Sequence, residues 1–304
     1  MNFNQNSALD QLMTLLFEPY KKSVADVQKV SNALLENGII TSEDEIVNDH
    51  IAFRTLGVPF LGIASLEKIF LHYGYEKRDY YFFEGKKLNA YWYAPPSPEY
   101  PRIFISELRV NDLPKATVEL IQSYTAKVTS DPVDALDLND PDAVGNFFYK
   151  SLWELPSIED YQTLAANSEY AAWVIYNRYY LNHYTISVHE LKEGYNTMEA
   201  FNAFLVGIGI KLNNSGGVIK QSADGLLRQS SSVAKMMQAT FKNGKMMEIP
   251  GSYVEFAERL ALPEFKEIEK SKLTRTQRRD GFESANADKI FESTYSSQTD
   301  SETN

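Results

Sequence analysis

"NDHIAFRTLG", residues 48–57, reads as a buried β-strand apart from two ionisable side chains, His50 and Arg54. Side chains alternate between the two faces of a strand, so these two residues, four positions apart, point to the same face. At about 3.3 Å per residue they lie about 13 Å apart. Burying an imidazole and a guanidinium costs free energy unless other polar groups meet them. This strand therefore predicts a polar site inside the fold.

A second stretch, "NHYTISV" (182–188), repeats this opening, because an Asx-His pair again precedes alternating apolar residues. Around both stretches the expected elements run in the order strand, helix, then further strands with Gly and Pro between them. We therefore predict an α+β fold of paired βαβββ modules, at about 46–111 and 173–260. Modules that pair side by side would bring their first strands together and direct His50 and His183 into a shared cavity.

Further segments are expected outside the two modules. Residues 7–37 have apolar positions at helical spacing and are followed by Gly38, which predicts an N-terminal helical segment. A polar, acidic and largely helical insertion is expected at about 112–172. From 271 to 304 the chain becomes charged and polar, and we expect this C-terminal segment to pack in part and then to become disordered.

The composition allows a large core and excludes several classes of protein. The chain has 304 residues, of which 43% are hydrophobic. A net charge of −11 argues against nucleic-acid binding, which needs clustered Lys and Arg. No apolar run approaches the ~20 residues that span a bilayer, and the N-terminal residues lack the features of a signal peptide. We therefore expect a soluble cytoplasmic protein, a monomer or a homodimer, that binds neither nucleic acid nor membrane.

The chain has no cysteine, which excludes disulfides, thiolate metal sites and a cysteine nucleophile. Any metal must therefore be held by His, Asp or Glu. Glu255 stands between Val254 and Phe256, an expensive place for a carboxylate unless something positive meets it. With His50 and His183 it would form the two-His, one-carboxylate triad of non-haem Fe(II) enzymes, which leaves positions open for substrate and O₂. Mn²⁺, Co²⁺, Ni²⁺ or Zn²⁺ would accept the same ligands, so the residue types do not identify the ion.

Each candidate has a structural alternative. Either histidine could be a hydrogen-bonded core residue, although the repeat of the Asx-His pair favours a shared site. Arg54 could instead pair with a buried carboxylate. Three other glutamates compete with Glu255 for the third ligand position: Glu107, Glu248 and Glu258.

Four stretches together resemble the 2-oxoadipate dioxygenase/decarboxylase family: "DHIAFRT" (49–55), "NHYTISV" (182–188), "GLLRQSSSVA" (225–234) and "IPGSYVEFAER" (249–259). The stretch "GFESANADKIFEST" (281–294) is similar to the closing segment of that family, so the resemblance covers about residues 7–295. The paired modules also resemble the vicinal oxygen chelate superfamily, in which such modules form a metal-binding β cup. "YVEFAER" is similar to the strand that carries the metal-binding Glu in 4-hydroxyphenylpyruvate dioxygenase.

The resemblance implies that residues 1–270 form a single vicinal oxygen chelate-like catalytic domain. Its metal, Fe(II), would be bound by His50, His183 and Glu255. The implied reaction is the oxidative decarboxylation and hydroxylation of 2-oxoadipate to 2-hydroxyglutarate and CO₂, a step of lysine catabolism. The partners would be a small 2-oxo acid, which can chelate Fe(II) through its carboxylate and keto oxygen, and O₂.

A dicarboxylic substrate needs a cation for its other end. Arg54 is expected to bind that carboxylate through paired hydrogen bonds and to serve catalysis by setting the chain length and register of the substrate. Gln229 and Ser230 are expected to be neutral substrate contacts. One departure is Arg228, which stands where the family pattern suggests an apolar residue.

Two other functions remain open. The first is a metal-dependent isomerase, lyase or hydrolase on the same scaffold, which would not consume O₂. The second is a non-catalytic protein that only binds ligands. O₂ consumption with release of CO₂ separates the proposed oxygenase from both.

Overall fold

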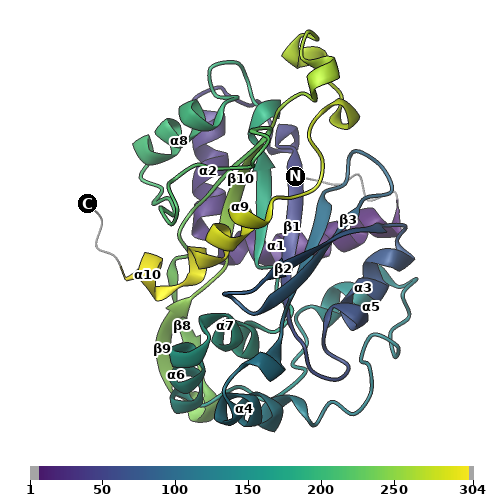
Figure 1. Ribbon diagram of the computed structural model, residues 1–304, viewed down its shortest axis with the longest axis vertical. Coiled ribbons are helices and arrows are strands. Elements are labelled where there is room, and N and C mark those ends of the chain that lie inside the picture. Colours follow the sequence, from purple (N-terminus) through teal and green to yellow (C-terminus); the bar gives the residue numbers. More distant parts are fainter. Residues whose placement is uncertain (1–6, 301–304) are drawn as a thin grey trace.

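The computed structural model describes residues 7–300, and one eight-stranded sheet organises the fold (Figure 1). The strands lie in the order β2-β3-β4-β1-β5-β10-β7-β6. Their bounds are β1 (Asn48–Leu56), β2 (Glu76–Phe83), β3 (Leu88–Ala94), β4 (Arg102–Leu108), β5 (His183–Ser187), β6 (Lys220–Gln221), β7 (Leu227–Ser231) and β10 (Tyr253–Arg259). Each predicted module supplies one half of the sheet, so the paired α+β architecture is confirmed.

The two modules meet where β1 pairs with β5. This pairing is antiparallel, and its register places Ala52 opposite His183. On either side of the seam, β1 is parallel to β4 and β5 is parallel to β10. The predicted meeting of the two first strands is therefore confirmed. It also follows that β1 and β4 begin at the same end of the sheet at which β5 and β10 end.

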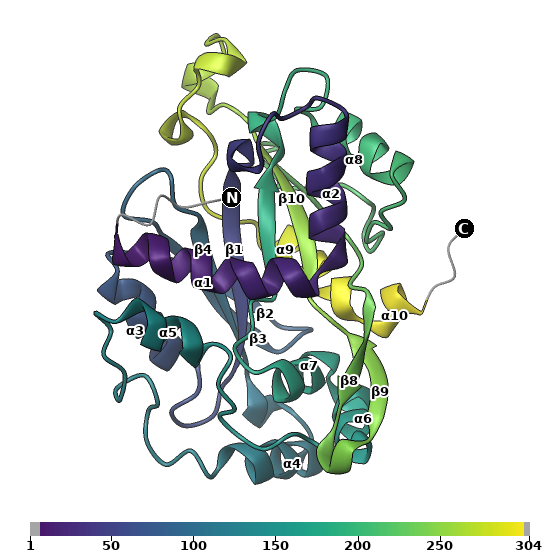
Figure 2. The same ribbon diagram turned by 180° about the vertical axis from the view of Figure 1, so that it is seen from behind.

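Helices cover the outer face of the sheet (Figure 2). These are α1 (Ala8–Ser23), α2 (Ala25–Glu36), α3 (Ile63–His72) and α8 (Met198–Gly207). The rings of Phe17 and Tyr20 in α1 pack edge-on against Tyr184 of β5, at 5.8 and 5.6 Å between centroids. The N-terminal segment is two helices that meet at Val24 rather than one continuous helix.

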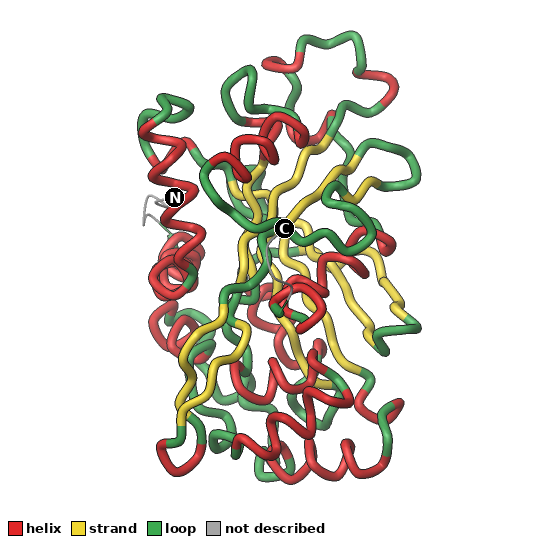
Figure 3. The backbone as a smooth tube through the Cα atoms, turned by 90° about the vertical axis from the view of Figure 1, so that its left-hand side faces the viewer, coloured by secondary structure: helices red, strands yellow, loops and turns green. Residues whose placement is uncertain are grey.

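The insertion between the modules is helical, as predicted, and contains α4 (Lys115–Thr125), α5 (Pro141–Phe147), α6 (Ile158–Asn167) and α7 (Glu169–Asn177). Figure 3 shows helices on one side of the strands and at one end of the molecule; by the labels of Figure 2 these are α1 and α2 on the side and α4 and α6 at the end, while α5 packs against α1. None of the helices in residues 7–300 is long and apolar enough to cross a membrane.

After its helix, where further strands are expected, the second module has two stretches that are not strands of the main sheet. The stretch 210–220 is mostly loop, because Gly216 and Gly217 have φ values of 65° and 97°, which extended strands do not adopt. The stretch 237–251 forms most of a separate hairpin, β8 (Met236–Thr240) and β9 (Met246–Pro250), instead of joining the main sheet. The ring of Phe241 beyond β8 packs against Tyr176 of α7, so the hairpin leans on the insertion.

The C-terminal segment crosses the inner face of the sheet (Figure 1). It contains α9 (Ser284–Ile290), the 3₁₀ turn η8 (Phe291–Thr294) and α10 (Ser296–Thr299). Phe282 packs on Phe104 of β4, with 4.9 Å between ring centroids. Ordered structure therefore continues to residue 300, and the disorder expected at the end of the chain concerns residues 301–304, which lie outside the described part.

Phe70 of α3 tests how tightly the outer helices are packed. Its side chain is fully buried and its ring contacts Phe53 and Phe148 at 5.4 and 6.1 Å. We expect Phe70→Ala to lower the free energy of unfolding by about 3–5 kcal/mol in chemical denaturation, because it leaves a cavity. The matched control is Phe82→Ala, at a side chain that is 52% exposed, where we expect less than about 1 kcal/mol. Equal losses would show that α3 is not packed as described.

Candidate active site

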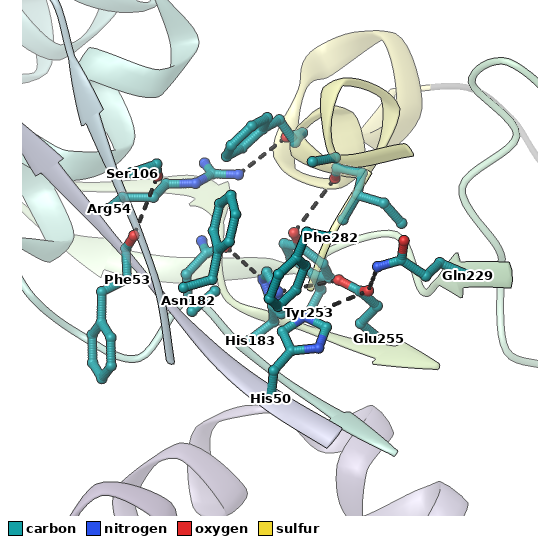
Figure 4. A pocket seen from close by; sticks show the side chains of 15 residues that line it. His50, Phe53, Arg54, Ser106, Asn182, His183, Gln229, Tyr253, Glu255 and Phe282 are labelled. Carbon is teal, nitrogen blue, oxygen red and sulfur yellow. Dashed lines mark hydrogen bonds and ion pairs between the residues drawn. The ribbon is translucent and has the colours of Figure 1, made fainter. Parts of the chain in front are cut away.

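Three side chains from neighbouring strands converge on the inner face: His50 of β1, His183 of β5 and Glu255 of β10 (Figure 4). All three are buried, and one potential ligand atom from each lies within 4.8 Å of the others. Glu255 Oε1 is 3.5 Å from His50 Nε2, and Glu255 Oε2 is 3.1 Å from His183 Nε2. Two atoms bound at about 2.1 Å to one ion are at most about 4.2 Å apart, so the two separations between Glu255 and the imidazoles suit a shared metal.

The residue before each histidine orients its ring. His50 Nδ1 donates to Asp49 Oδ1 at 2.8 Å, and His183 Nδ1 donates to Asn182 Oδ1 at 3.0 Å. With each Nδ1 occupied in this way, each Nε2 keeps its lone pair for a metal or another partner. Thr185 Oγ1 lies 3.0 Å from His50 Nε2. The Asx-His repeat in the sequence thus has a structural role that sequence reasoning did not assign.

Aromatic rings hold the two imidazoles from the sides. Phe282 packs edge-on against His50 with 4.8 Å between ring centroids, and Tyr253 lies against His183 at 4.7 Å. Both rings belong to the lining of a pocket that also contains the three converging side chains. The cavity that remains is about 20 Å³, enough for about one water-sized group, because the C-terminal segment covers it.

The electrostatics of the cluster favour a cation. Burial alone would raise the pKa of Glu255, but the imidazoles of His50 and His183 outweigh it and lower that pKa to about 2. Burial lowers the pKa of His183, which favours the neutral imidazole that metals bind. Burial also acts to lower the pKa of His50, yet the carboxylates of Glu255 and Asp49 outweigh it and raise that pKa. Because Glu255 is ionised and positive charge is stabilised beside it, the donor set fits a metal ion.

Asp49 is itself held by two arginines. Arg259 Nε and Nη2 donate to its two carboxylate oxygens at 2.6 and 2.9 Å, and Arg102 Nη1 donates at 3.4 Å. Burial would raise the pKa of Asp49, but these guanidinium groups and the bond from His50 hold it well below its usual range. Arg259 and Glu255 point to the same face of β10. This strand therefore supplies one candidate metal ligand, Glu255, and supports another, His50, through the contact between Arg259 and Asp49.

Of the two expected neutral contacts, the structure places only Gln229 in the pocket. Its Nε2 donates to Glu255 Oε1 at 2.6 Å, and its Oε1 accepts from Asn286 Nδ2 of α9 at 2.9 Å. Ser230 is the next residue on β7 and therefore faces the other side of the sheet. Its hydroxyl donates to Asn202 of α8 at 2.7 Å, so the structure separates it from the site.

The three rival glutamates are engaged elsewhere. Glu107 accepts from the backbone of Ile63 at 2.8 Å, and Glu258 accepts from the backbone of Met198 at 3.0 Å. Glu248 accepts from Gln238 at 3.0 Å on the β8–β9 hairpin.

Arg54 is a buried cation without a carboxylate partner. Its side chain is 1% exposed, and none of the carboxylates in residues 7–300 lies within ion-pair distance of it. Nη1 donates to Thr294 Oγ1 at 2.9 Å and Nη2 to the Phe291 carbonyl at 3.1 Å, while Nε has no hydrogen-bond partner. The guanidinium also lies 5.2 Å from the ring centroids of Tyr170 and Trp173. A charge buried in this way is costly, which makes the place suitable for an anionic group.

The support of Asp49 can be tested through stability. We expect Asp49→Asn to lower the free energy of unfolding by about 3–5 kcal/mol in chemical denaturation, because the buried Arg259 and Arg102 lose their shared carboxylate. The matched control is Asp112→Asn, whose partner Arg109 is partly exposed, with an expected loss of about 0–1 kcal/mol. If both variants unfold alike, the buried ion pair does not support the site.

Comparison with known proteins shows what the chain resembles. A family model described as 2-oxoadipate dioxygenase/decarboxylase matches residues 12–270. The chloroplastic 2-oxoadipate dioxygenase/decarboxylase of Arabidopsis thaliana is 44% identical over 267 residues, which are 84% of this chain and 70% of the plant protein.

Two solved structures resemble the fold. Hydroxyglutarate synthase from Oryza sativa, in complex with 2-oxoadipate, aligns with a TM-score of 0.85 and 39% identity over 94% of this chain and 92% of that one. A protein of the glyoxalase superfamily from Ralstonia eutropha aligns with a TM-score of 0.68 and 20% identity over 91% of this chain and 87% of that one. The second comparison concerns the fold alone.

Proposed function

The chain belongs to the 2-oxoadipate dioxygenase/decarboxylase family and is an enzyme, and we propose that it converts 2-oxoadipate and O₂ to 2-hydroxyglutarate and CO₂, a step of lysine catabolism. The reaction balances without a separate 2-oxoglutarate cosubstrate. One oxygen atom enters the carboxylate that forms from the keto carbon, and the other becomes the hydroxyl. The observation that carries the proposal is the buried His50–His183–Glu255 cluster in one pocket with Arg54, a buried cation that lacks a carboxylate.

We propose Fe(II) as the metal and His50, His183 and Glu255 as its ligands. Two imidazoles and one carboxylate are the donor set of non-haem iron oxygenases, and Mn²⁺, Co²⁺, Ni²⁺ or Zn²⁺ would accept the same donors in a purified sample. When bound, Fe(II) would bind the 2-oxo acid through its carboxylate and keto oxygen and supply electrons to O₂.

The surrounding residues keep this donor set in place. Asp49 and Asn182 hold the two imidazoles by Nδ1, so that Nε2 of each ring faces Glu255. Gln229 donates to Glu255 and is oriented in turn by Asn286. We therefore assign Gln229 the role of positioning the carboxylate. Burial of the whole cluster under the C-terminal segment keeps bulk water away from the reacting groups.

Arg54 is proposed to bind the far carboxylate of the substrate. Its Nε is free to donate, and its two Nη groups donate to neutral oxygens of the C-terminal segment. A carboxylate is a stronger acceptor for guanidinium than a hydroxyl or a carbonyl. Because the cavity is only about 20 Å³, a six-carbon dicarboxylate would have to displace part of that segment from Arg54. Arg54 thereby determines how far from the metal the reacting carbons lie.

Other aspects of the function stay predictions. The isomerase, lyase or hydrolase reaction and the non-catalytic binding protein are separated from the proposal by O₂ uptake. The cytoplasmic location, a monomer or homodimer, and residues 1–270 as one catalytic domain also stay predictions.

The reaction can be tested by oxygen uptake after anaerobic reconstitution with Fe(II). We expect uptake with 2-oxoadipate to exceed that with shorter or longer 2-oxo dicarboxylates, with one CO₂ released per O₂, because Arg54 sets the length. An oxygen electrode and CO₂ trapping measure both quantities. Bound iron without oxygen uptake on any of these acids would rule out the oxygenase reaction.

The role of Arg54 is tested by Arg54→Met, which removes the cation but keeps the apolar stem. Loss of a charge-assisted hydrogen bond predicts a KM for 2-oxoadipate at least about tenfold higher. Iron content, measured by metal analysis, is expected to be unchanged. Arg109→Met, at the far end of β4, serves as the control and should change neither quantity. Loss of iron from Arg54→Met would show instead that Arg54 supports the metal centre or the fold.

A further inference from the structure

A second cavity lies at the end of the sheet where β1 and β4 begin and β5 and β10 end. Its volume is about 420 Å³. Arg102, Arg259, Arg275 and Arg278 line it. Phe282 separates it from the metal pocket, because its ring packs on His50 on one side and lies 5.5 Å from the Arg259 guanidinium on the other. This cavity has no part in the proposed reaction.

Of the arginines that line this cavity, Arg275 has no carboxylate of the described residues within ion-pair distance, whereas Arg102, Arg259 and Arg278 each have at least one. Four arginines line it, against three carboxylates. Asp49 is already bound by Arg259 and His50, and Glu99 is exposed. Glu190 is 40% exposed and reaches only 3.7 Å from Arg278 Nε. Asp280, outside the lining, is 58% exposed and binds Arg102 Nε. Burial lowers the pKa of His189 to about 3, so that imidazole is uncharged.

Three arginines of the lining carry buried donors that make no hydrogen bond. Arg102 Nη2, Arg275 Nη2 and Arg278 Nε are buried and have no hydrogen-bond partner among the described groups. Arg102 is 2% exposed and Arg278 is 5% exposed. Leaving a buried donor unpaired is unfavourable, so a structure that does so three times around one cavity is suited to a ligand that accepts hydrogen bonds.

The chain also holds these guanidinium groups in position. Arg275 Nη1 donates to the carbonyls of Pro98 and Tyr100 at 2.8 and 2.7 Å. Arg278 donates to the carbonyls of Arg259 and Lys270 at 3.0 and 3.1 Å. Since these contacts are made to neutral carbonyls, they fix the side chains without neutralising their charge. A ligand would therefore meet donors that need little reorganisation.

We propose that this cavity binds a small oxyanion, a carboxylate or a phosphate group, through Arg102, Arg275 and Arg278. Guanidinium groups recognise both anions by paired hydrogen bonds. The site is distinct from the one at Arg54, which lies farther along β1 beyond the metal ligands. The cavity also lies next to the residues that orient the proposed metal ligand His50, because Arg102 donates to the Asp49 carboxylate that accepts a hydrogen bond from His50.

Titration calorimetry on the full metal-loaded chain tests the proposal with two probes. Sulfate stands for a phosphate group without precipitating iron, and succinate stands for a carboxylate. We expect one-site binding of at least one probe, and the probe that binds identifies the class of ligand. Arg275→Gln is expected to weaken binding about tenfold or more, because a charge-assisted hydrogen bond is lost. Arg278→Gln should do the same and provides a second variant if the first does not fold.

Two controls separate this site from the active site and from general charge effects. Arg109→Gln removes a charge outside the cavity and should bind the probe as the unmodified chain does. Arg54→Met should also retain binding, whether or not the proposed reaction is correct. Absence of binding by both probes would overturn the proposal. So would binding that survives Arg275→Gln and Arg278→Gln, or binding that is lost in Arg54→Met.

Discussion

The antiparallel pairing of β1 with β5 is the constraint on which the rest of the site depends. In this register Ala52 lies opposite His183, and the parallel pairing of β5 with β10 places Thr185 opposite Glu255. Side chains alternate between faces, so a slip of one residue in either pairing would turn an imidazole or the carboxylate to the outer face. The helices on the outer face oppose such a slip, because they bury the alternate residues of the same strands.

Burial of charge is the second feature of the molecule, and it divides the inner face of the sheet into three regions. In the middle, Glu255 faces two imidazoles. At one end Arg54 contacts only neutral groups, and at the other end Arg259 and Arg102 surround Asp49. Each buried charge carries a desolvation penalty, so buried ion pairs are often no more stable than apolar residues of similar volume. The cost is understandable if the unpaired positive charges serve to bind anions.

Much of the fold and site could be predicted from the sequence, because it depends on local patterns. The repeated Asx-His openings predicted the seam, and Glu255 was recognisable as a carboxylate between two apolar neighbours in a strand. Period-two alternation placed Arg54 on the face of His50. The same alternation places Ser230 and Gln229 on opposite faces of the sheet, because they are neighbours on one strand. The prediction that Ser230 contacts the substrate did not take this into account.

The remaining features depend on contacts between distant segments. Nothing in the local pattern of residues 281–294 shows that this segment covers the pocket and that Thr294 and Phe291 bind Arg54. The β8–β9 hairpin could not be told from a strand pair of the main sheet, because its sequence has the same alternation. Asp49 and Asn182 carried a signal, the repeated Asx before His, but their role follows only from the orientation of the rings.

The proposed chemistry requires that two imidazoles and one carboxylate from β1, β5 and β10 bind one ion. Anomalous diffraction at the iron absorption edge, from crystals reconstituted anaerobically with Fe(II), tests it most directly. We expect a single strong peak about 2.1 Å from His50 Nε2, His183 Nε2 and a Glu255 oxygen. Iron bound elsewhere, or a site that omits any of these three side chains, would contradict it.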